Sequence, residues 1–183
     1  MKQIYFLRHG ESKAQTEEQF SFDADLSKRG VKQSELSGEL LKDIPFDIAF
    51  ISPLRRARQT FEVAKLTAAS NIFEVNLIEE MPPESYQTLL PYEALPDYGM
   101  IKSIDQWLMP LETRAAAFIE MIKEYRDGKY LIVAHQGTIN ELLKQLLQVT
   151  ENNASFYSDN CGCSKIIINE EGKIILLYLN RKK

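Results

Sequence analysis

At Ile4-Tyr5-Phe6-Leu7-Arg8-His9-Gly10, a short apolar run ends in a histidine that is followed by a glycine. A second run, Tyr130-Leu131-Ile132-Val133-Ala134-His135-Gln136-Gly137, repeats the pattern, and the chain contains no other histidine. Continuous apolar stretches of this length are typical of strands that are covered on both faces. Each imidazole therefore stands where a strand passes into a loop, which is where α/β sheets place their sites. If the two strands are neighbours, both imidazoles face a single pocket.

The bulk composition is that of a globular protein, with 183 residues, 44% apolar content, a net charge of −4 and a pI near 5.4. This length predicts one domain over residues 1–183. The negative balance argues against nucleic-acid or membrane partners, because both need clustered positive charge. Without a signal-like or membrane-spanning stretch, we expect a cytoplasmic protein. Cys161 and Cys163 are too close in sequence to close a useful disulfide loop, which indicates reduced structural thiols.

Strand-like and helix-like patterns alternate along the chain. We expect strands at residues 4–7, 48–51, 75–78, 130–134, 165–168 and 174–179, the last two joined by a hairpin-like turn at 170–173. We expect helices from Ser27 to about 41, from Ser52-Pro53 to about 66, from 111 to about 125 with an end at Asp127-Gly128, and around 142–147. Residues 81–110, rich in proline and aromatic side chains, are interpreted as an insertion that covers the site. The alternation predicts a three-layer α/β fold, with helices on both faces of a mainly parallel sheet.

The first of these helices has apolar residues near helical spacing. Val31, Leu36, Leu40 and Leu41 are expected to form the stripe that faces the core.

Two segments carry residues that suit a phosphate. Arg8-His9-Gly10-Glu11-Ser12 joins a fixed cation, a nucleophile and a glycine that lets a ligand approach the backbone. Residues 52–60 add Arg55, Arg56 and Arg58 at the start of a helix, where the dipole favours anions. Neighbours on a helix lie about 100° apart, so Arg55 and Arg56 cannot both point inward. One of them is expected to meet the ligand, and Arg58 is expected on a solvated face.

Four motifs together resemble the histidine phosphatase superfamily, also called the phosphoglycerate mutase-like family. Residues 8–12 match its R-H-G-E-T/S, and residues 26–33 resemble L-T-x-x-G-x-x-Q. Residues 52–60 resemble S-x-L-x-R-A-x-Q-T, and residues 133–139 resemble V-x-H-G-G-x-I. The four occur in the family's order, and their joint match is highly specific. The resemblance implies the phosphoglycerate mutase-like fold.

The resemblance also implies roles for residues of this chain. His9 is expected to attack phosphorus and become a phosphohistidine, while Arg8, Arg56 and His135 bind the phosphoryl oxygens. Forked guanidiniums suit this task, because the transferring group carries spread negative charge. No metal or other cofactor is expected.

The family uses a carboxylic acid soon after the third strand, which leaves Glu79 and Glu80. Glu80 is preferred, because an apolar residue follows it in Ile78-Glu79-Glu80-Met81, as in the family's pattern. The alternative, Leu77-Ile78-Glu79, places a charge at that position. A pKa raised by burial would let the chosen glutamate act as general acid and later as base.

The chain departs from the family at several positions. Gln15 stands where many members have asparagine, and Gln136 replaces a glycine beside His135, which predicts an amide near the pocket rim. Residues 82–86 replace an aromatic-glycine stretch. Asn160 either reaches the site or serves a turn, the turn being favoured. These departures make the family's substrates unsafe to transfer.

The residues favour a phosphatase that hydrolyses a phosphomonoester on a small phosphorylated metabolite, or a phosphohistidine on a protein. A phosphoglycerate-type phosphomutase is the first alternative, and the short chain argues against it. A non-catalytic phosphate-binding protein is the second. No oligomeric state is predicted.

Overall fold

The computed structural model describes residues 1–16, 21–66, 69–80, 109–150 and 154–183. Within these residues one sheet has the strand order β3-β2-β4-β1-β5-β6. Its strands are β1 (Lys2–Arg8), β2 (Ile48–Ile51), β3 (Asn71–Glu74), β4 (Gly128–Ala134), β5 (Cys163–Ile168) and β6 (Ile174–Arg181). The strands from β3 to β1 run parallel, β5 is antiparallel to β1, and β6 is antiparallel to β5. The mainly parallel sheet predicted from the sequence is confirmed.

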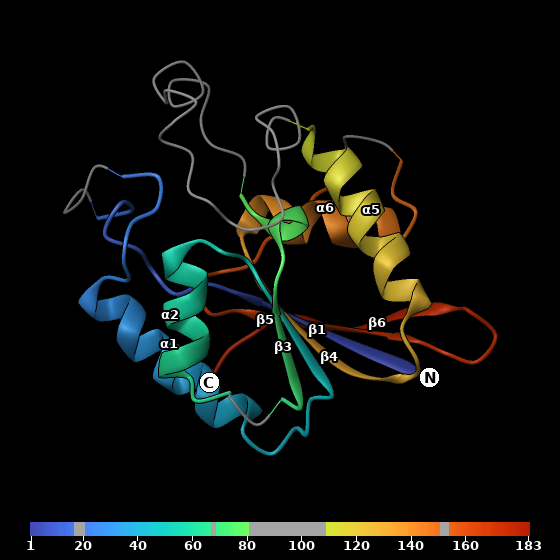
Figure 1. Ribbon diagram of the computed structural model, residues 1–183, viewed down its shortest axis with the longest axis horizontal. Coiled ribbons are helices and arrows are strands. Elements are labelled where there is room, and N and C mark those ends of the chain that lie inside the picture. Colours follow the sequence, from blue (N-terminus) through green and yellow to red (C-terminus); the bar gives the residue numbers. More distant parts are fainter. Residues whose placement is uncertain (17–20, 67–68, 81–108, 151–153) are drawn as a thin grey trace.

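Helices cover both faces of this sheet (Figure 1). One face carries α1 (Lys28–Leu41) and α2 (Arg55–Val63), and the other carries α5 (Leu111–Glu124) and α6 (Gln136–Leu146). Successive side chains of a strand point to opposite faces, so β1 sends Tyr5 and Leu7 toward α1 and α2. Ile4 and Phe6 pack toward α5 and α6. This division into two cores produces the predicted three layers.

The third strand lies earlier in the chain than predicted. β3 spans Asn71–Glu74, and the expected strand at 75–78 is instead a single 3-10 turn, η1 (Asn76–Ile78). Every residue of β3 is exposed and β3 lies at the edge of the sheet, so it lacks a buried apolar pattern. Val75 and Ile78 are buried after the strand has ended. The sequence pattern therefore marked the buried turn rather than the strand.

Helix α1 has the predicted ends but a different buried face. Ser27 caps it by accepting a hydrogen bond from Gly30 N at 3.0 Å. Val31 and Leu36 are 36% and 47% exposed, which contradicts the predicted stripe. The buried face consists of small residues, with Leu41 at its end: Gly30, Ser34, Ser37 and Gly38. A Cβ on Gly38 would lie 2.3 Å from Ala64 O, so only small residues allow this close approach between backbones.

Other boundaries also differ from the prediction. Helix α2 begins at Arg55, after Ser52-Pro53, because residues 52–54 still form the turn that follows β2. Helix α5 ends at Glu124, and Gly128 opens β4 instead of ending the helix. Most of the predicted insertion, residues 81–108, lies outside the described residues.

Two further observations concern the described residues. Cys161 and Cys163 are buried free thiols, as expected. None of the helices in this part of the chain has the length and apolar character needed to cross a membrane.

Candidate active site

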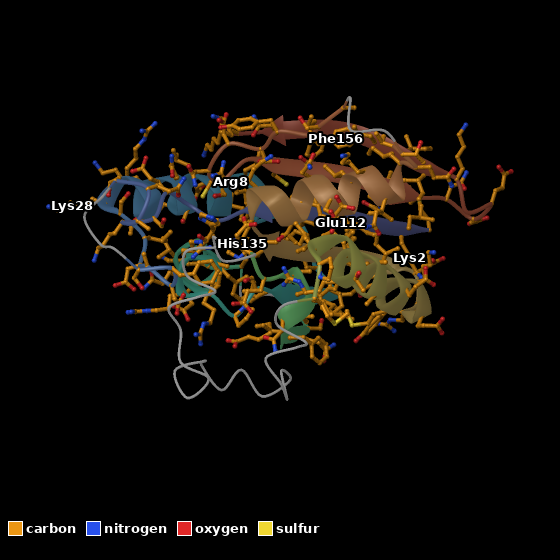
Figure 2. The ribbon with its side chains drawn as sticks, turned by 90° about the horizontal axis from the view of Figure 1, so that it is seen from above. Lys2, Arg8, Lys28, Glu112, His135 and Phe156 are labelled. Atoms are coloured by element: carbon orange, nitrogen blue, oxygen red, sulfur yellow. The ribbon has the colours of Figure 1, made fainter. Side chains whose placement is uncertain are left out.

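The two histidines lie side by side at the carboxyl ends of neighbouring strands. β1 and β4 pair in parallel with Arg8 opposite Ala134, and His9 N donates to Ala134 O at 3.0 Å. The imidazole centroids are 5.0 Å apart, and both side chains are buried. Figure 2 shows Arg8 and His135 together, far from Lys2 at the other end of β1. The structure thus brings both predicted histidines to one place.

His9 is held by one ring nitrogen. Its Nδ1 lies 2.6 Å from the carbonyl oxygen of Gly10. Because a carbonyl oxygen only accepts, Nδ1 carries the proton and the neutral ring keeps its lone pair on Nε2. Arg56 Nε donates toward that Nε2 at 3.3 Å. The unprotonated nitrogen of His9 therefore faces a guanidinium.

The surroundings disfavour the charged form of both imidazoles. Burial lowers the pKa of His9 well below its usual 6.5, and the charges of Arg56 and Arg8 lower it further, against the opposing hydrogen bond to Gly10. Burial likewise lowers the pKa of His135, followed by Arg56, His9, Arg8 and Arg114. Both rings are therefore neutral at pH 7.

The neighbouring arginines of α2 point in different directions, as the helical spacing requires. Arg56 is 7% exposed, and its Nη1 donates to Phe22 O at 2.7 Å while Nε reaches His9. Arg55 points outward and pairs with Asp25 at 2.7 Å. Arg58 is paired with Glu74 at 3.6 Å on the exposed side of the helix. Arg56 is thus the arginine of this motif that reaches the histidines.

Arg8 approaches the same place from the end of β1. Its Nη1 donates to the Ser158 carbonyl at 2.6 Å. Its Nε is buried and has no hydrogen-bond partner among the described residues. One side of the guanidinium is therefore anchored, while Nε remains available to a ligand.

His135 is anchored through Ser52. Its Nε2 lies 2.7 Å from Ser52 Oγ, at the end of β2. The described residues offer no hydrogen-bond partner to His135 Nδ1 or to the buried Ser158 Oγ. A buried polar atom without a partner costs about 1–3 kcal/mol. Together with Arg8 Nε, these atoms form a set that an anionic ligand with several oxygens could satisfy.

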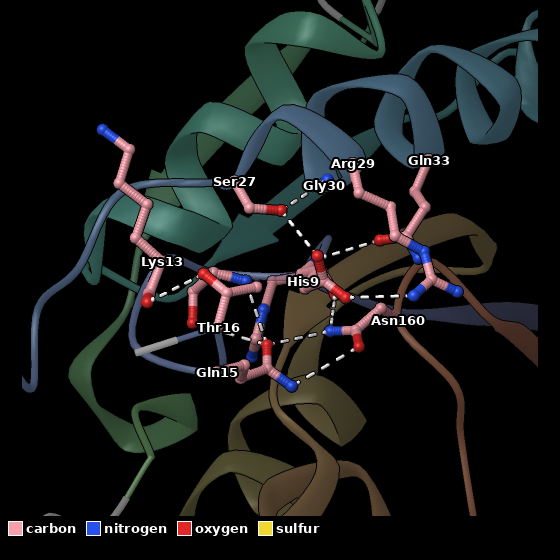
Figure 3. Close-up of polar contacts among 11 residues, drawn as sticks. His9, Lys13, Gln15, Thr16, Ser27, Arg29, Gly30, Gln33 and Asn160 are labelled. Carbon is pink, nitrogen blue, oxygen red and sulfur yellow. Dashed lines mark hydrogen bonds and ion pairs between the residues drawn. The ribbon is translucent and has the colours of Figure 1, made fainter. Parts of the chain in front are cut away.

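The loop after His9 is fixed by its backbone. Gly10 N donates to Thr60 Oγ1 at 2.9 Å, and Asn160 Nδ2 donates to His9 O at 3.1 Å. Figure 3 shows Asn160 between His9 and Gln15, and the two amides exchange contacts of 3.2 and 3.4 Å. Asn160 also lies inside a turn that the hydrogen bond from Gly162 N to Asp159 O closes at 2.8 Å, so the favoured turn role is confirmed, and the side chain in addition contacts the loop after His9.

Gly10 was predicted to let a ligand approach the backbone, and the structure shows a different close approach at this position. A Cβ at this position would lie 2.6 Å from Gly30 O, so the close approach is to the backbone of α1. The glycine lets the histidine loop pack on that helix.

The two candidate acids occupy different surroundings. Glu79 is fully buried, and its backbone carbonyl accepts from Thr138 Oγ1 at 3.3 Å. Glu80 is partly exposed, and its carboxylate lies over Gly137, where a Cβ would be 2.7 Å from Oε1. Gly137 is in the first turn of α6, two residues after His135. Glu80 thus lies beside the first turn of the helix that begins directly after His135, and it is partly exposed.

Comparison with known proteins places this arrangement in a family. The model of the histidine phosphatase superfamily (branch 1) matches residues 4–181. The chain belongs to the histidine phosphatase superfamily. This membership accounts for the order of the four sequence motifs and for the paired histidines.

Two of the matched relatives are named as phosphatases. The chain is 30% identical over 182 residues to a probable 2-carboxy-D-arabinitol-1-phosphatase of Arabidopsis thaliana, covering 89% of this chain but 37% of that protein. The chain thus spans little more than a third of that plant relative. It is 28% identical over 202 residues to a putative phosphoserine phosphatase 2 of Hydrogenobacter thermophilus, covering 99% and 96% of the two chains.

Solved structures agree in fold. A putative alpha-ribazole-5'-P phosphatase of Escherichia coli superposes with a TM-score of 0.77 at 23% identity, over 99% of this chain and 98% of that one. Phosphoglycerate mutases are also among the matched proteins. The chain therefore has the phosphoglycerate mutase-like fold that the sequence predicted.

Several contacts of the site were not predicted from the sequence. Ser52 and Thr60 are the first and last residues of the motif at residues 52–60, and this position was the sequence signal that could have indicated their contacts with the site. No sequence signal indicated Ser158, because a single serine after an irregular stretch is ordinary. Across the described ranges, His, Cys, Asp and Glu side chains do not gather in groups of three or more that could hold a metal ion.

Proposed function

We propose that this chain is a phosphatase that hydrolyses a phosphomonoester through a phosphohistidine on His9, without a metal ion. The observation that carries the proposal is the hydrogen bond between His9 Nδ1 and the Gly10 carbonyl. It leaves the lone pair on Nε2, inside a buried site beside Arg56. A neutral imidazole with its lone pair on Nε2 is the form that can attack phosphorus.

In the first step, His9 Nε2 forms a bond to phosphorus and the ester P–O bond breaks. Arg8 and Arg56 neutralise the charge on the transferring phosphoryl group, and His135 donates a hydrogen bond to it. Positioning and charge complement supply most of the rate in phosphoryl transfer. The buried, incompletely paired atoms of Arg8 and His135 support these roles.

Glu80 is the proposed general acid for the leaving alkoxide. Its place over Gly137, two residues from His135, supports this choice, and so does its partial exposure. In the second step the Glu80 carboxylate takes a proton from water, and the oxygen of that water attacks phosphorus. The P–N bond breaks, inorganic phosphate leaves, and His9 returns to its neutral form.

The proposed substrate class is a small phosphorylated metabolite. The names of the relatives support it, since carboxyarabinitol phosphate, phosphoserine and ribazole phosphate are all small phosphomonoesters. A phosphohistidine on a protein is the alternative substrate. A phosphomutase is the alternative reaction, because mutases are among the matched proteins.

The test is hydrolysis of an aryl phosphate with a chelator present. Wild type is expected to turn over, and His9→Ala is expected to lose at least about a thousandfold in kcat, because the covalent route is gone. Arg58→Ala, on the exposed side of α2, is the matched control and should keep full activity. Rapid quenching in base should trap an acid-labile phosphoprotein in wild type but not in His9→Ala.

Three outcomes would contradict the proposal. Normal turnover by His9→Ala would exclude the covalent mechanism. Phosphorylation of His9 with phosphoryl return to a second hydroxyl, and little hydrolysis, would make the chain a mutase. Phosphate binding with neither turnover nor phosphorylation would make it a binding protein.

A further inference from the structure

The side chain of Gln136 is turned toward the segment of residues 156–158. Its Nε2 donates to Phe156 O at 2.9 Å, and its Oε1 accepts from Ser158 N at 2.7 Å. Both polar atoms of the amide are therefore engaged by backbone. This differs from the predicted amide at the pocket rim.

Ser158 connects Gln136 to Arg8. Ser158 is buried, its N–H is held by Gln136, and its carbonyl accepts from Arg8 Nη1 at 2.6 Å. Side chains as long as arginine lose rotamer freedom when they bind a ligand. A contact that fixes the guanidinium beforehand lowers this cost and raises affinity.

We propose that Gln136 is a positioning residue for phosphate binding. It holds the Ser158 carbonyl at the place where that carbonyl fixes Arg8 Nη1, and Arg8 Nε is thereby directed toward a phosphoryl oxygen. The inference rests on the proposed function, because it assumes that Arg8 binds the phosphoryl group. A glycine at this position, as in the family motif, can make neither side-chain contact.

Asn140 provides a matched control within the same helix. It lies one turn after Gln136 on α6, and its Oδ1 accepts from Phe156 N at 2.7 Å. It therefore holds the same segment without touching Ser158. Asn140→Ala tests whether general loosening of the segment is enough to weaken phosphate binding.

The experiment measures KM and kcat for an aryl phosphate, together with Ki for inorganic phosphate. Gln136→Met, which keeps the length of the side chain, is expected to raise KM and Ki by about five- to tenfold, with a smaller change in kcat. Gln136→Gly is the second variant, because the family motif tolerates glycine here. Asn140→Ala is expected to stay within about twofold of wild type for both constants. Urea unfolding checks that each variant is folded.

A double-mutant cycle identifies the route of the effect. In an Arg8→Lys background, Gln136→Met should raise Ki for phosphate by less than about twofold, because the guanidinium that it positions is absent. Full additivity of the two substitutions in their effect on Ki would overturn the inference. An equal rise of Ki in Asn140→Ala would also overturn it, and so would an unchanged Ki in both Gln136 variants.

Measurements on the wild type distinguish failure of the positioning role from failure of the proposed function. Turnover and phosphate binding by wild type, with an unchanged Ki in the Gln136 variants, would refute the positioning role alone. A wild type that neither hydrolyses the ester nor binds inorganic phosphate in calorimetry would refute the proposed function, and the positioning role with it.

Discussion

Glu79 and Glu80 show how much adjacent residues of one type can differ. Glu79 is sealed from solvent near Arg114, and its negative charge works to raise the pKa of that arginine against the effect of burial. Glu80 is partly exposed and lies over the first turn of α6. The first environment suits a structural charge, and the second suits a group that meets substrate.

We therefore predict opposite effects for the two amide variants. Glu80→Gln should lower kcat by about a hundredfold or more, because it cannot protonate the leaving group, and should cost little stability because the side chain is partly exposed. Glu79→Gln should destabilise the fold by about 3 kcal/mol, because it removes the larger of the two carboxylate charges, Glu79 and Glu80, that oppose the effect of burial on Arg114. Steady-state kinetics and urea unfolding of both variants measure this. A reversed result would make Glu79 the acid.

The closeness of His9, His135 and Arg56 followed from the sequence, because motifs carried these residues. The family resemblance already chose Arg56 over Arg55, and the structure adds the physical reason, because Asp25 holds Arg55 outside. Gln136 was noticed as a departure, but its direction depends on Phe156 and Ser158, which are distant in the sequence. Contacts between a side chain and a distant backbone leave no local pattern to read.

At the scale of elements, α1 packs through small side chains against other backbones. Gly38→Ala should destabilise the protein by about 1–3 kcal/mol, because its new Cβ would meet Ala64 O at the end of α2. Leu36→Ala, on the exposed side of the same helix, should change stability by less than about 0.5 kcal/mol. Urea unfolding distinguishes them, and a larger loss for Leu36→Ala would restore the apolar stripe predicted from sequence.

The errors in predicting the buried face of α1 and the position of β3 have one cause. Hydrophobic periodicity reports burial of large side chains, and it identified the central strands and α5 well. It misses a helix buried through glycine and serine, as in α1, and an exposed edge strand such as β3. In both cases the backbone is placed by its neighbours in space.

At the scale of the whole molecule, the two buried imidazoles link stability to pH. In the unfolded chain both take up protons as the pH falls below about 6.5, while in the folded chain their lowered pKa values keep them neutral. The unfolded state therefore binds more protons, and the free energy of unfolding should fall as the pH drops from 7.5 toward 5.5. Urea unfolding at these two values measures the loss.

A variant without either imidazole provides the control for this prediction. His9→Gln combined with His135→Gln should show a clearly smaller loss over the same pH interval, because neither site can take up the proton. An equal loss in the double variant would assign the pH dependence to other groups.

The position of β1 also has a consequence for how the molecule forms. This strand spans residues 2–8, yet its partners in the sheet are β4 and β5, which come from residues 128–134 and 163–168. Pairing over such separations in sequence closes large loops and slows folding. His9 therefore has no companion imidazole until β4 has paired with β1. A partly folded chain in which this pairing has not formed lacks the assembled pair of histidines.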